Sequence, residues 1–196
     1  AIPILEESGL IIPVGKWIIQ NAFSMCTECR KYYPEFRVSI NLSYVQILKS
    51  PLMMELKQII DHSGISCSGI IVELTESGYL EGTPAVRSVW NDMKQLRIQI
   101  ALDDFGTGYS NLMNISNLEP DIVKLDRGFT LKALSRSYEY QLMQYVIEMV
   151  HKLNQYVCVE GVETKEDLEK IKALGPDLIQ GYYYSKPCSR DEFLKK

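Results

Sequence analysis

Two patterns of apolar positions alternate along the chain. Apolar residues recur every three or four positions in five stretches, which is the spacing of a helix with one buried face. Short runs rich in β-branched residues lie between these stretches and favour strands. The pattern predicts helices at 12–33, 50–63, 83–96, 138–153 and 165–174, and strands at 37–42, 69–74, 98–102, 121–125, 155–159 and 177–180.

The predicted strands are apolar on both faces. Residues 69–72 and 98–102 are nearly continuous apolar runs, as expected of parallel strands that helices cover on both sides. Nearly every strand is followed by a helix, so the order of elements predicts an α/β fold. No Pro-rich or Gly-rich linker and no low-complexity tract interrupts it, and residues 1–196 are therefore predicted to form one domain.

The spacing of the strands narrows the choice of architecture. Strand starts recur about every 28 residues, so eight βα units would need about 224 residues, close to the roughly 250 of a typical (βα)8 barrel. The chain has 196 residues and six predicted strands. Two architectures fit: an open, doubly wound sheet, or a TIM-like barrel with about six βα units present and its first two strands before Ala1.

A polar residue that can bind a metal or a phosphate lies at the carboxyl end of every predicted strand. In parallel β/α folds these ends share one face, where active sites are found. Any one of these residues could equally be a helix cap or the start of a solvated loop. The series is Asn41, Glu73, Asp103 with Asp104, Lys124, Glu160 and Gln180.

Taken together, these residues predict a metal site. Carboxylates crowded on one face raise each other's pKa unless a cation joins them. Carboxylate and amide oxygens are hard donors that suit Mg²⁺ or Mn²⁺, and both histidines fall in predicted helices. Asp103 could bridge two ions while Asp104 holds the second, the arrangement that hydrolyses phosphate esters. Lys124 adds a positive charge that could steady the attacking water or the phosphoryl group.

Composition and charge exclude several classes of function. The chain has 25 Asp and Glu against 21 Lys and Arg, a net charge of −4, which offers no broad basic surface for DNA. No stretch approaches the roughly 18 apolar residues of a membrane helix, and the first residues do not resemble a secretory signal. Five cysteines, an odd number, argue against a disulfide framework. These features predict a cytoplasmic domain with unpaired thiols and no membrane contact of its own.

Four further sequence features give weak support, or none, for a functional role. The Asp-Phe-Gly at 104–106 is not a kinase motif, because the other kinase signatures are missing. Cys26 and Cys29 have zinc spacing but no second pair, so packing inside a helix is the favoured interpretation. The tyrosines at 182–184 are predicted to be core residues more than base-stacking ones. Glu163 fits a second-shell partner and a helix's first turn equally well.

The polar motifs, in their order and spacing, resemble the EAL-domain family of bacterial cyclic di-GMP phosphodiesterases. The resemblance covers nearly the whole chain. It rests on the segments Ser-Ile-Asn-Leu-Ser at 39–43, Glu-Leu-Thr-Glu-Ser at 73–77, Asp-Asp-Phe-Gly-Thr-Gly-Tyr-Ser at 103–110, Lys-Leu-Asp-Arg at 124–127, Glu-Gly-Val-Glu-Thr at 160–164 and Gln-Gly-Tyr at 180–182.

The resemblance implies a modified (βα)8 barrel with two Mg²⁺ or Mn²⁺ ions that hydrolyses cyclic di-GMP to linear pGpG. It implies that Lys124 positions the nucleophilic water and that Gln180, Glu76 and Asp126 support the site. Glu76 would anchor the loop after Asp104, which helps to bind metal and contributes to a homodimer interface. The implied metal ligands are Asn41, Glu73 and Asp103 for one ion, and Asp103, Asp104 and Glu160 for the other.

One departure from the family pattern bears on activity. The Glu-Ala-Leu tripeptide that names the family occurs nowhere in this sequence. The family places it upstream of the segment that resembles residues 2–10, together with a metal-ligand Glu and a phosphate-binding Arg. We therefore expect that this chain is an N-terminally truncated, C-terminal three-quarters of an EAL domain, and such a fragment need not be active by itself.

Three functions stay open at this point. The leading one is a metal-dependent phosphodiesterase, in a parent protein fused to sensory or diguanylate cyclase domains that could anchor it in a membrane. The second is a degenerate module that senses cyclic di-GMP without cleaving it. The third is an aldolase with Lys124 as a Schiff-base residue, which neighbouring carboxylates disfavour because they would hold the amine protonated.

Overall fold

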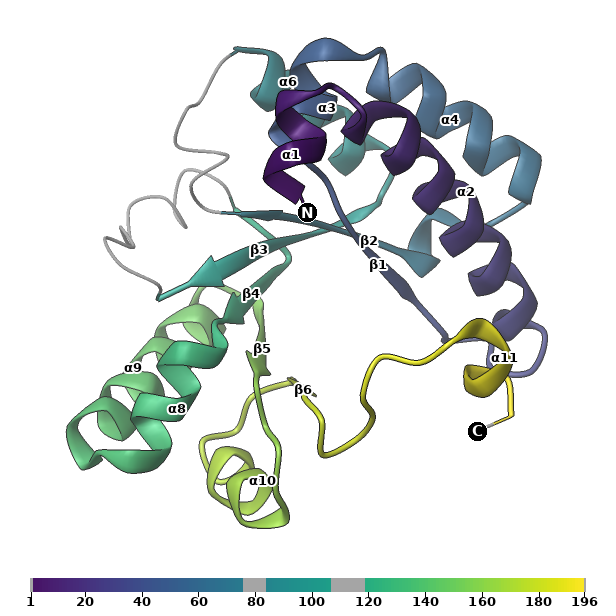
Figure 1. The fold of residues 1–196 in the computed structure, drawn as a ribbon. Helices are drawn as coiled ribbons and strands as arrows, with labels where there is room; N and C mark the ends of the chain where they lie inside the picture. The colour runs from purple at the N-terminus through teal and green to yellow at the C-terminus, as the bar shows by residue number, and fades with distance from the viewer. Residues whose placement is uncertain (1, 76–83, 107–118, 196) are drawn as a thin grey trace. The chain divides into compact units, whose positions relative to one another are not determined.

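The computed structural model describes residues 2–75, 84–106 and 119–195. The chain divides into two compact units, Ala1–Ile100 and Ala101–Lys196, each with its own internal contacts. Figure 1 traces both units by residue number. Strand β3 (Gln99–Phe105) contributes its first two residues to the first unit and the rest to the second.

The first unit builds two parallel strands and packs helices against them. Strand β1 pairs with β2 in parallel, and the register sets Asn41 beside Glu73 at the carboxyl ends. Helices α2 and α4 contact one another along their lengths (Figure 1). Its elements are α1 (Ile2–Glu7), α2 (Ile11–Arg30), β1 (Val38–Asn41), α3 (Tyr44–Lys49), α4 (Leu52–Ser63), the 3₁₀ helix η1 (Cys67–Gly69), β2 (Ile70–Thr75) and α6 (Pro84–Gln95).

The core of the first unit follows the apolar spacing of its helices. Helix α2 buries Ile11, Ile19, Phe23 and Cys26 along one face. Helix α4 buries Leu52, Leu56 and Ile59, and it ends at Gly64, whose φ of 67° suits a left-handed cap. Helix α3 begins with a capping box between Ser43 and Gln46.

The second unit continues the parallel arrangement through four neighbouring strands. Strand β3 pairs with β4, β4 with β5 and β5 with β6, all in parallel. The register sets Lys124 beside Cys158 and Glu160 beside Gln180. Its further elements are β4 (Ile122–Leu125), α8 (Arg127–Ser135), α9 (Ser137–Lys152), β5 (Tyr156–Glu160), α10 (Lys165–Lys172), β6 (Leu178–Gln180) and α11 (Arg190–Phe193).

The α/β prediction is confirmed, and all six predicted strands are present in the described residues within a few residues of their expected bounds. The largest difference in a strand is β3, which runs to Phe105, three residues beyond its predicted end. The β3–β4 register shifts between Leu102 and Phe105, and Asp104 has a φ of 60° there. Asp103 and Asp104 therefore lie on an irregular strand end rather than after it. An apolar pattern cannot predict this irregularity because both residues are polar.

The helices that the apolar pattern did not predict include α3 and α8. Helix α3 has only six residues, too few for a helical period to stand out. Helix α8 follows β4 directly, because the Asp126 side chain accepts a hydrogen bond from Gly128 N at 2.6 Å and caps the helix. Arg136 then has an extended backbone, which separates α8 from α9.

Candidate functional site

A buried lysine joins three strand ends in the second unit. Lys124 lies on β4, whose four residues are all buried, and its side chain is only 6% exposed. Its Nζ lies 2.7 Å from Glu160 Oε1 on β5 and 3.2 Å from Asp103 Oδ1 on β3. The structure thus brings together three of the residues that the sequence predicted as site residues.

The electrostatics of this cluster follow from burial. An ammonium group removed from water is costly unless opposite charges and hydrogen bonds offset the loss of hydration. Asp103 and Glu160 supply those charges, with side chains 14% and 18% exposed. One ammonium against two carboxylates leaves an excess of negative charge at the strand ends. The cluster can therefore still attract a cation.

The end of β3 gives the cluster a further acceptor. Asp103 Oδ1 is buried and, beyond its ion pair with Lys124, accepts no hydrogen bond. Asp104 has left-handed backbone angles, which aspartate adopts more readily than most residues but still at a cost. Two neighbouring carboxylates, one of which carries a buried oxygen that accepts no hydrogen bond beyond its ion pair, present the oxygen donors that suit a hard cation.

Gln180 and Asp126 occupy the edges of this cluster. The carbonyl oxygen of Gln180 accepts hydrogen bonds from Gly161 N at 2.9 Å and Val162 N at 3.3 Å, so β6 holds the segment that follows Glu160. Asp126 caps α8 with its side chain. In the described contacts, both residues support the backbone around the cluster.

The first unit holds a second pair of predicted site residues. Glu73 is buried at the end of β2, and its Oε1 accepts a hydrogen bond from Ser39 Oγ at 2.5 Å. Asn41 lies beside Glu73 in the β1–β2 register, and Ser39 and Asn41 share one face of β1 because side chains alternate along a strand. Ser39 was missed as a site residue, although its position two residues before Asn41 was a usable signal.

Two predicted features cannot be placed. Glu76 and most of the loop after Asp104, residues 107–118, lie outside the described residues, and so does the homodimer interface predicted for that loop. Over residues 2–75, 84–106 and 119–195, no group of three or more His, Cys, Asp or Glu is arranged to hold a metal ion.

Three weaker sequence signals are resolved. Cys26 and Cys29 are buried in α2, as predicted for packing, and burial raises the pKa of the Cys26 thiol. The prediction that the tyrosines at 182–184 are core residues was wrong: they are 54%, 39% and 57% exposed, since they follow the short, half-exposed strand β6. Glu163 precedes the cap of α10 and binds Arg127 instead of lying in the helix.

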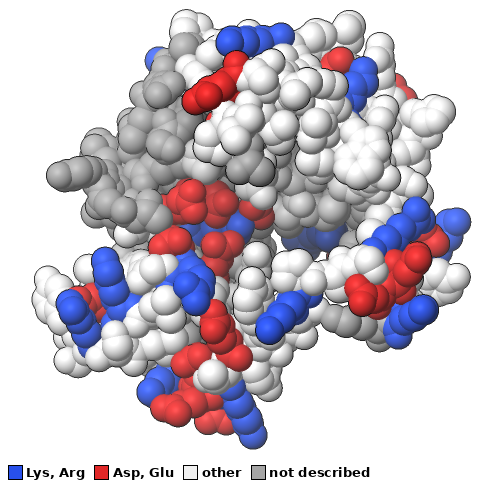
Figure 2. Space-filling view, viewed as in Figure 1, with Lys and Arg blue, Asp and Glu red and all other residues white. Residues whose placement is uncertain are grey.

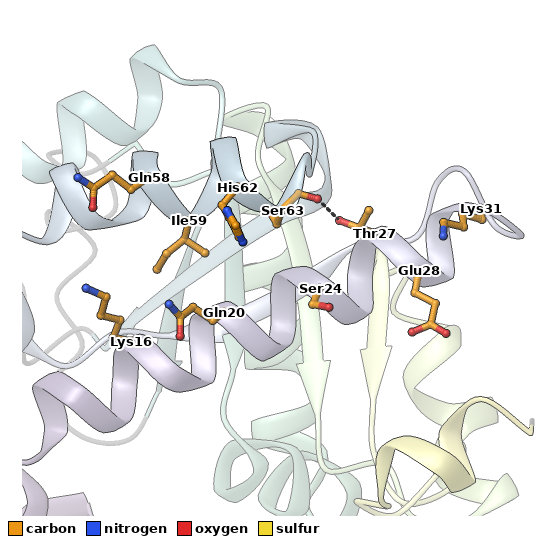
Figure 3. Close-up of a pocket in the computed structure, with 10 residues that line it drawn as sticks. All are labelled: Lys16, Gln20, Ser24, Thr27, Glu28, Lys31, Gln58, Ile59, His62 and Ser63. Atoms are coloured by element: carbon orange, nitrogen blue, oxygen red, sulfur yellow. Dashed lines mark hydrogen bonds between the residues drawn. The ribbon is translucent and has the colours of Figure 1, made fainter.

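A spacious hollow in the first unit lies elsewhere, between α2 and α4 (Figure 3). It has a volume of about 910 Å³, and His62 of α4 points toward Gln20 and Ser24 of α2. Thr27 Oγ1 donates to the Ser63 carbonyl across it at 3.4 Å. We name this hollow the helix groove; it is lined by Lys16, Gln20, Ser24, Thr27, Glu28, Lys31, Gln58, Ile59, His62 and Ser63.

The helix groove is the weaker candidate for catalysis. Half of its ten lining residues carry hydroxyl or amide side chains, and Lys16 is already paired with Glu55 at 3.1 Å. It lies on helices, whereas β/α folds place catalysis at the carboxyl ends of strands. On the face seen in Figure 2, Lys and Arg are interspersed with Asp and Glu rather than gathered in one basic area.

A parallel β/α fold with an acidic cluster at its strand ends defines the class of protein. Residues 1–187 match the EAL domain family, and the chain therefore belongs to that family. No helix in the described part of the chain has the length and apolar character needed to cross a membrane.

Known proteins similar to the chain agree with this assignment. The cyclic di-GMP phosphodiesterase PdeR of Escherichia coli is 33% identical over 182 residues, which cover 93% of this chain and 28% of PdeR. The chain spans about a quarter of the length of the first curated relatives that it matches.

Two solved structures share the fold over nearly the whole chain. The PaMucR phosphodiesterase in complex with c-di-GMP is 26% identical with a TM-score of 0.90, covering 98% of this chain and 78% of its own. The EAL enzyme Bd1971, with cAMP and cyclic di-GMP bound, is 30% identical with a TM-score of 0.92, covering 99% and 54%. The predicted TIM-like fold of the EAL type is thereby confirmed.

Proposed function

We propose that this EAL domain is the catalytic part of a cyclic di-GMP phosphodiesterase that produces linear pGpG. The observation that carries the proposal is the buried Lys124 held between Asp103 and Glu160 at three adjacent strand ends. A domain that no longer cleaved its ligand would have little reason to keep so costly an arrangement. The names of the relatives, which are cyclic di-GMP phosphodiesterases, support the same substrate.

The metal ligands predicted from the sequence have the chemistry that suits divalent cations such as Mg²⁺ or Mn²⁺. Every proposed ligand presents an oxygen, which these hard ions prefer. When bound, such ions lower the pKa of water and neutralise the charge of a phosphoryl group. The residues that would hold them are Asn41, Glu73, Asp103, Asp104 and Glu160.

The chain's own groups then have separate tasks. The Lys124 ammonium donates hydrogen bonds from a fixed position, so it can orient the attacking water and oppose the negative charge that develops on the phosphate. The carboxylate of Glu160 fixes that ammonium at 2.7 Å. Ser39 holds Glu73 by a hydrogen bond, so this proposed ligand also has a fixed orientation. Gln180 and Asp126 support the backbone beneath these groups.

The test is a product assay. The full-length gene product is incubated with cyclic di-GMP and Mg²⁺ or Mn²⁺, and chromatography detects pGpG. We expect turnover by the full-length product and a loss of about 100-fold or more for Lys124→Met and Glu160→Gln. Lys16→Met, in the helix groove, is the matched control and should keep full activity.

The outcomes separate the alternatives. Calorimetric binding of cyclic di-GMP without pGpG formation by the full-length product would overturn hydrolysis in favour of the sensor module. Trapping of Lys124 by borohydride with a carbonyl substrate would instead favour the aldolase. Turnover that survives both substitutions would show that the cluster is not the active site.

We also propose that the domain works beside a signalling partner. MucR of Pseudomonas aeruginosa is named as a bifunctional diguanylate cyclase and phosphodiesterase, and DosP of Escherichia coli as an oxygen sensor protein. Fusion to such a sensory or cyclase domain, a homodimer and a cytoplasmic location remain predictions for this protein. All five cysteines lie in the described residues as thiols.

A further inference from the structure

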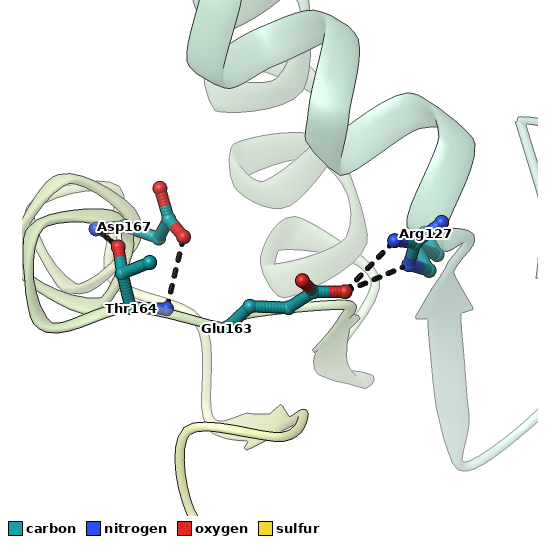
Figure 4. A network of polar contacts seen from close by, with 4 residues as sticks. All are labelled: Arg127, Glu163, Thr164 and Asp167. Carbon is teal, nitrogen blue, oxygen red and sulfur yellow. Dashed lines mark hydrogen bonds and ion pairs between the residues drawn. The ribbon is translucent and has the colours of Figure 1, made fainter.

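An ion pair connects the two loops that follow Lys124 and Glu160. Arg127 is the first residue of α8, and its Nε and Nη2 both donate to Glu163 Oε1, at 3.2 and 2.8 Å. Figure 4 shows the two side chains extended toward one another from the start of α8 and the segment before α10. The hydrogen bond and charge of Glu163 raise the pKa of Arg127.

The aliphatic stem of Arg127, its Cβ and Cγ, covers the backbone next to Glu160. A Cβ at Gly161 would lie 2.4 Å from Arg127 Cγ, and Gly161 has a φ of 82°. Only glycine therefore fits at the position after Glu160 while Arg127 keeps its place. The contact means that Arg127 limits where the backbone that carries Glu160 can lie.

The opposite side of the same segment is held by β6 and the turn after it. Gly161 N and Val162 N donate to the Gln180 carbonyl, and Tyr183 N donates to the Val162 carbonyl at 3.1 Å. A Cβ at Gly181 would lie 2.0 Å from Val162 O. The residues after Glu160 are thus enclosed between the Arg127 stem and the backbone after β6.

The position of Glu163 is itself fixed by the start of α10. Thr164 Oγ1 accepts from Asp167 N at 3.1 Å, and Asp167 Oδ2 accepts from Thr164 N at 3.0 Å (Figure 4). This capping box anchors the backbone directly after Glu163. Its carboxylate is therefore presented to Arg127 from a defined point.

We propose that Arg127 and Glu163 are positioning residues that aim the Glu160 carboxylate at Lys124 and at the cation that Glu160 would hold. The proposal rests on the proposed function. The Arg127 and Glu163 side chains are 57% and 39% exposed, so their pair adds little to stability. We expect the pair to act by orienting Glu160 instead. Substituting a residue that orients a metal ligand typically lowers metal affinity or activity 10- to 100-fold.

The experiment compares Arg127→Met, Arg127→Lys and Glu163→Gln in the full-length gene product. Glu166→Gln is the matched control, because Glu166 forms another exposed pair, with Lys170 at 2.8 Å in α10. Mn²⁺ affinity is measured by calorimetry without substrate, together with kcat, KM and the thermal midpoint. Mn²⁺ affinity is the readout that a merely structural link would not move.

We expect Arg127→Met and Glu163→Gln to lower Mn²⁺ affinity and kcat about 10-fold or more, with KM and the thermal midpoint nearly unchanged. Arg127→Lys should recover part of both losses, and Glu166→Gln should behave as the unsubstituted protein. In the Glu160→Gln background, Arg127→Met should weaken Mn²⁺ binding no further, because its effect passes through Glu160.

Three results would overturn the proposal. Activity that falls only in step with the thermal midpoint would make the pair a structural link. A raised KM with unchanged kcat and Mn²⁺ affinity would make Arg127 a substrate contact. Equal effects of Arg127→Met with and without Glu160 would show independent action. An unsubstituted protein that binds Mn²⁺ but forms no pGpG would contradict the proposed function alone, since the Mn²⁺ comparison still decides the role of the pair.

Discussion

The strand-end cluster around Lys124 and the helix groove between α2 and α4 differ in what their side chains can do. The groove is spacious, with a volume of about 910 Å³. Its Lys16 is 41% exposed, so water can hydrate the ammonium group whether or not Glu55 pairs with it. The cluster gives Lys124 almost no exposure and surrounds it with two carboxylates. Chemistry is therefore indicated by costly burial of charge rather than by the size of a hollow.

The largest effect should come from removing the two lysines in turn. Lys124→Met leaves two largely buried carboxylates, 14% and 18% exposed, without their cation, and we expect a loss of about 3 kcal/mol in the free energy of unfolding. Lys16→Met should cost less than about 1 kcal/mol, since an exposed pair is worth little. Urea denaturation measures both values.

The same experiment can reveal a cation site. Mn²⁺ should restore part of the stability of Lys124→Met, because a cation can offset the carboxylates that the ammonium no longer neutralises. Equal losses for the two variants would abolish the contrast between cluster and groove.

A smaller difference in stability is expected between the loss of the Ser39 hydroxyl and the loss of the Thr27 hydroxyl. Ser39 donates to the buried Glu73 at 2.5 Å, so Ser39→Ala should lower the free energy of unfolding by about 1.5 to 3 kcal/mol, the range for a hydrogen bond to a charged group. Thr27→Val in the groove loses a hydroxyl that donates to the Phe23 carbonyl at 3.0 Å and the Ser63 carbonyl at 3.4 Å, and because both acceptors are uncharged it should cost about 1 kcal/mol. Thermal melts of the two variants would sharpen the contrast; a reversed order would contradict it.

The smallest expected effect is the pH dependence of stability that comes from Cys26, on the buried side of α2. Because burial raises the pKa of Cys26, the folded state keeps the thiol proton at a pH where the unfolded state has lost it. The stability of the protein relative to Cys26→Ala should be constant below about pH 8.5, the ordinary thiol pKa, and should fall as the pH rises further. Urea titrations at pH 7 and pH 9.5 test the sign, with Cys188→Ala, an exposed thiol, as the control.

Most of the fold could be predicted from the chain itself. The apolar runs marked all six strands, because strands covered on both faces must be apolar throughout. The long helices followed from residues such as Ile19 and Phe23, which recur at helical spacing. The short helices α3 and α8 were missed because capping residues mark where they begin, whereas they are too short to show a clear helical spacing of apolar residues.

The candidate site divides in the same way. Position at a strand end was enough to select Lys124, Glu160 and Glu73, because the direction of parallel strands is a topological property. The pairing of Lys124 with Asp103, the bond from Ser39 and the link between Arg127 and Glu163 were not predictable, because each joins residues that are distant in sequence. The exposure of the tyrosines at 182–184 was mispredicted for the same reason.

By itself, then, the sequence determined which residues lie at the carboxyl ends of the strands and what kinds of donor they carry, since both follow from local periodicity and side-chain chemistry. Only the tertiary structure decided which charge neutralises which. It also decided the irregular end of β3, where Asp104 has a positive φ, and the close packing of the Arg127 side chain on Gly161, which leaves no room for a Cβ there. These features depend on register and packing between strands, and no local pattern encodes them.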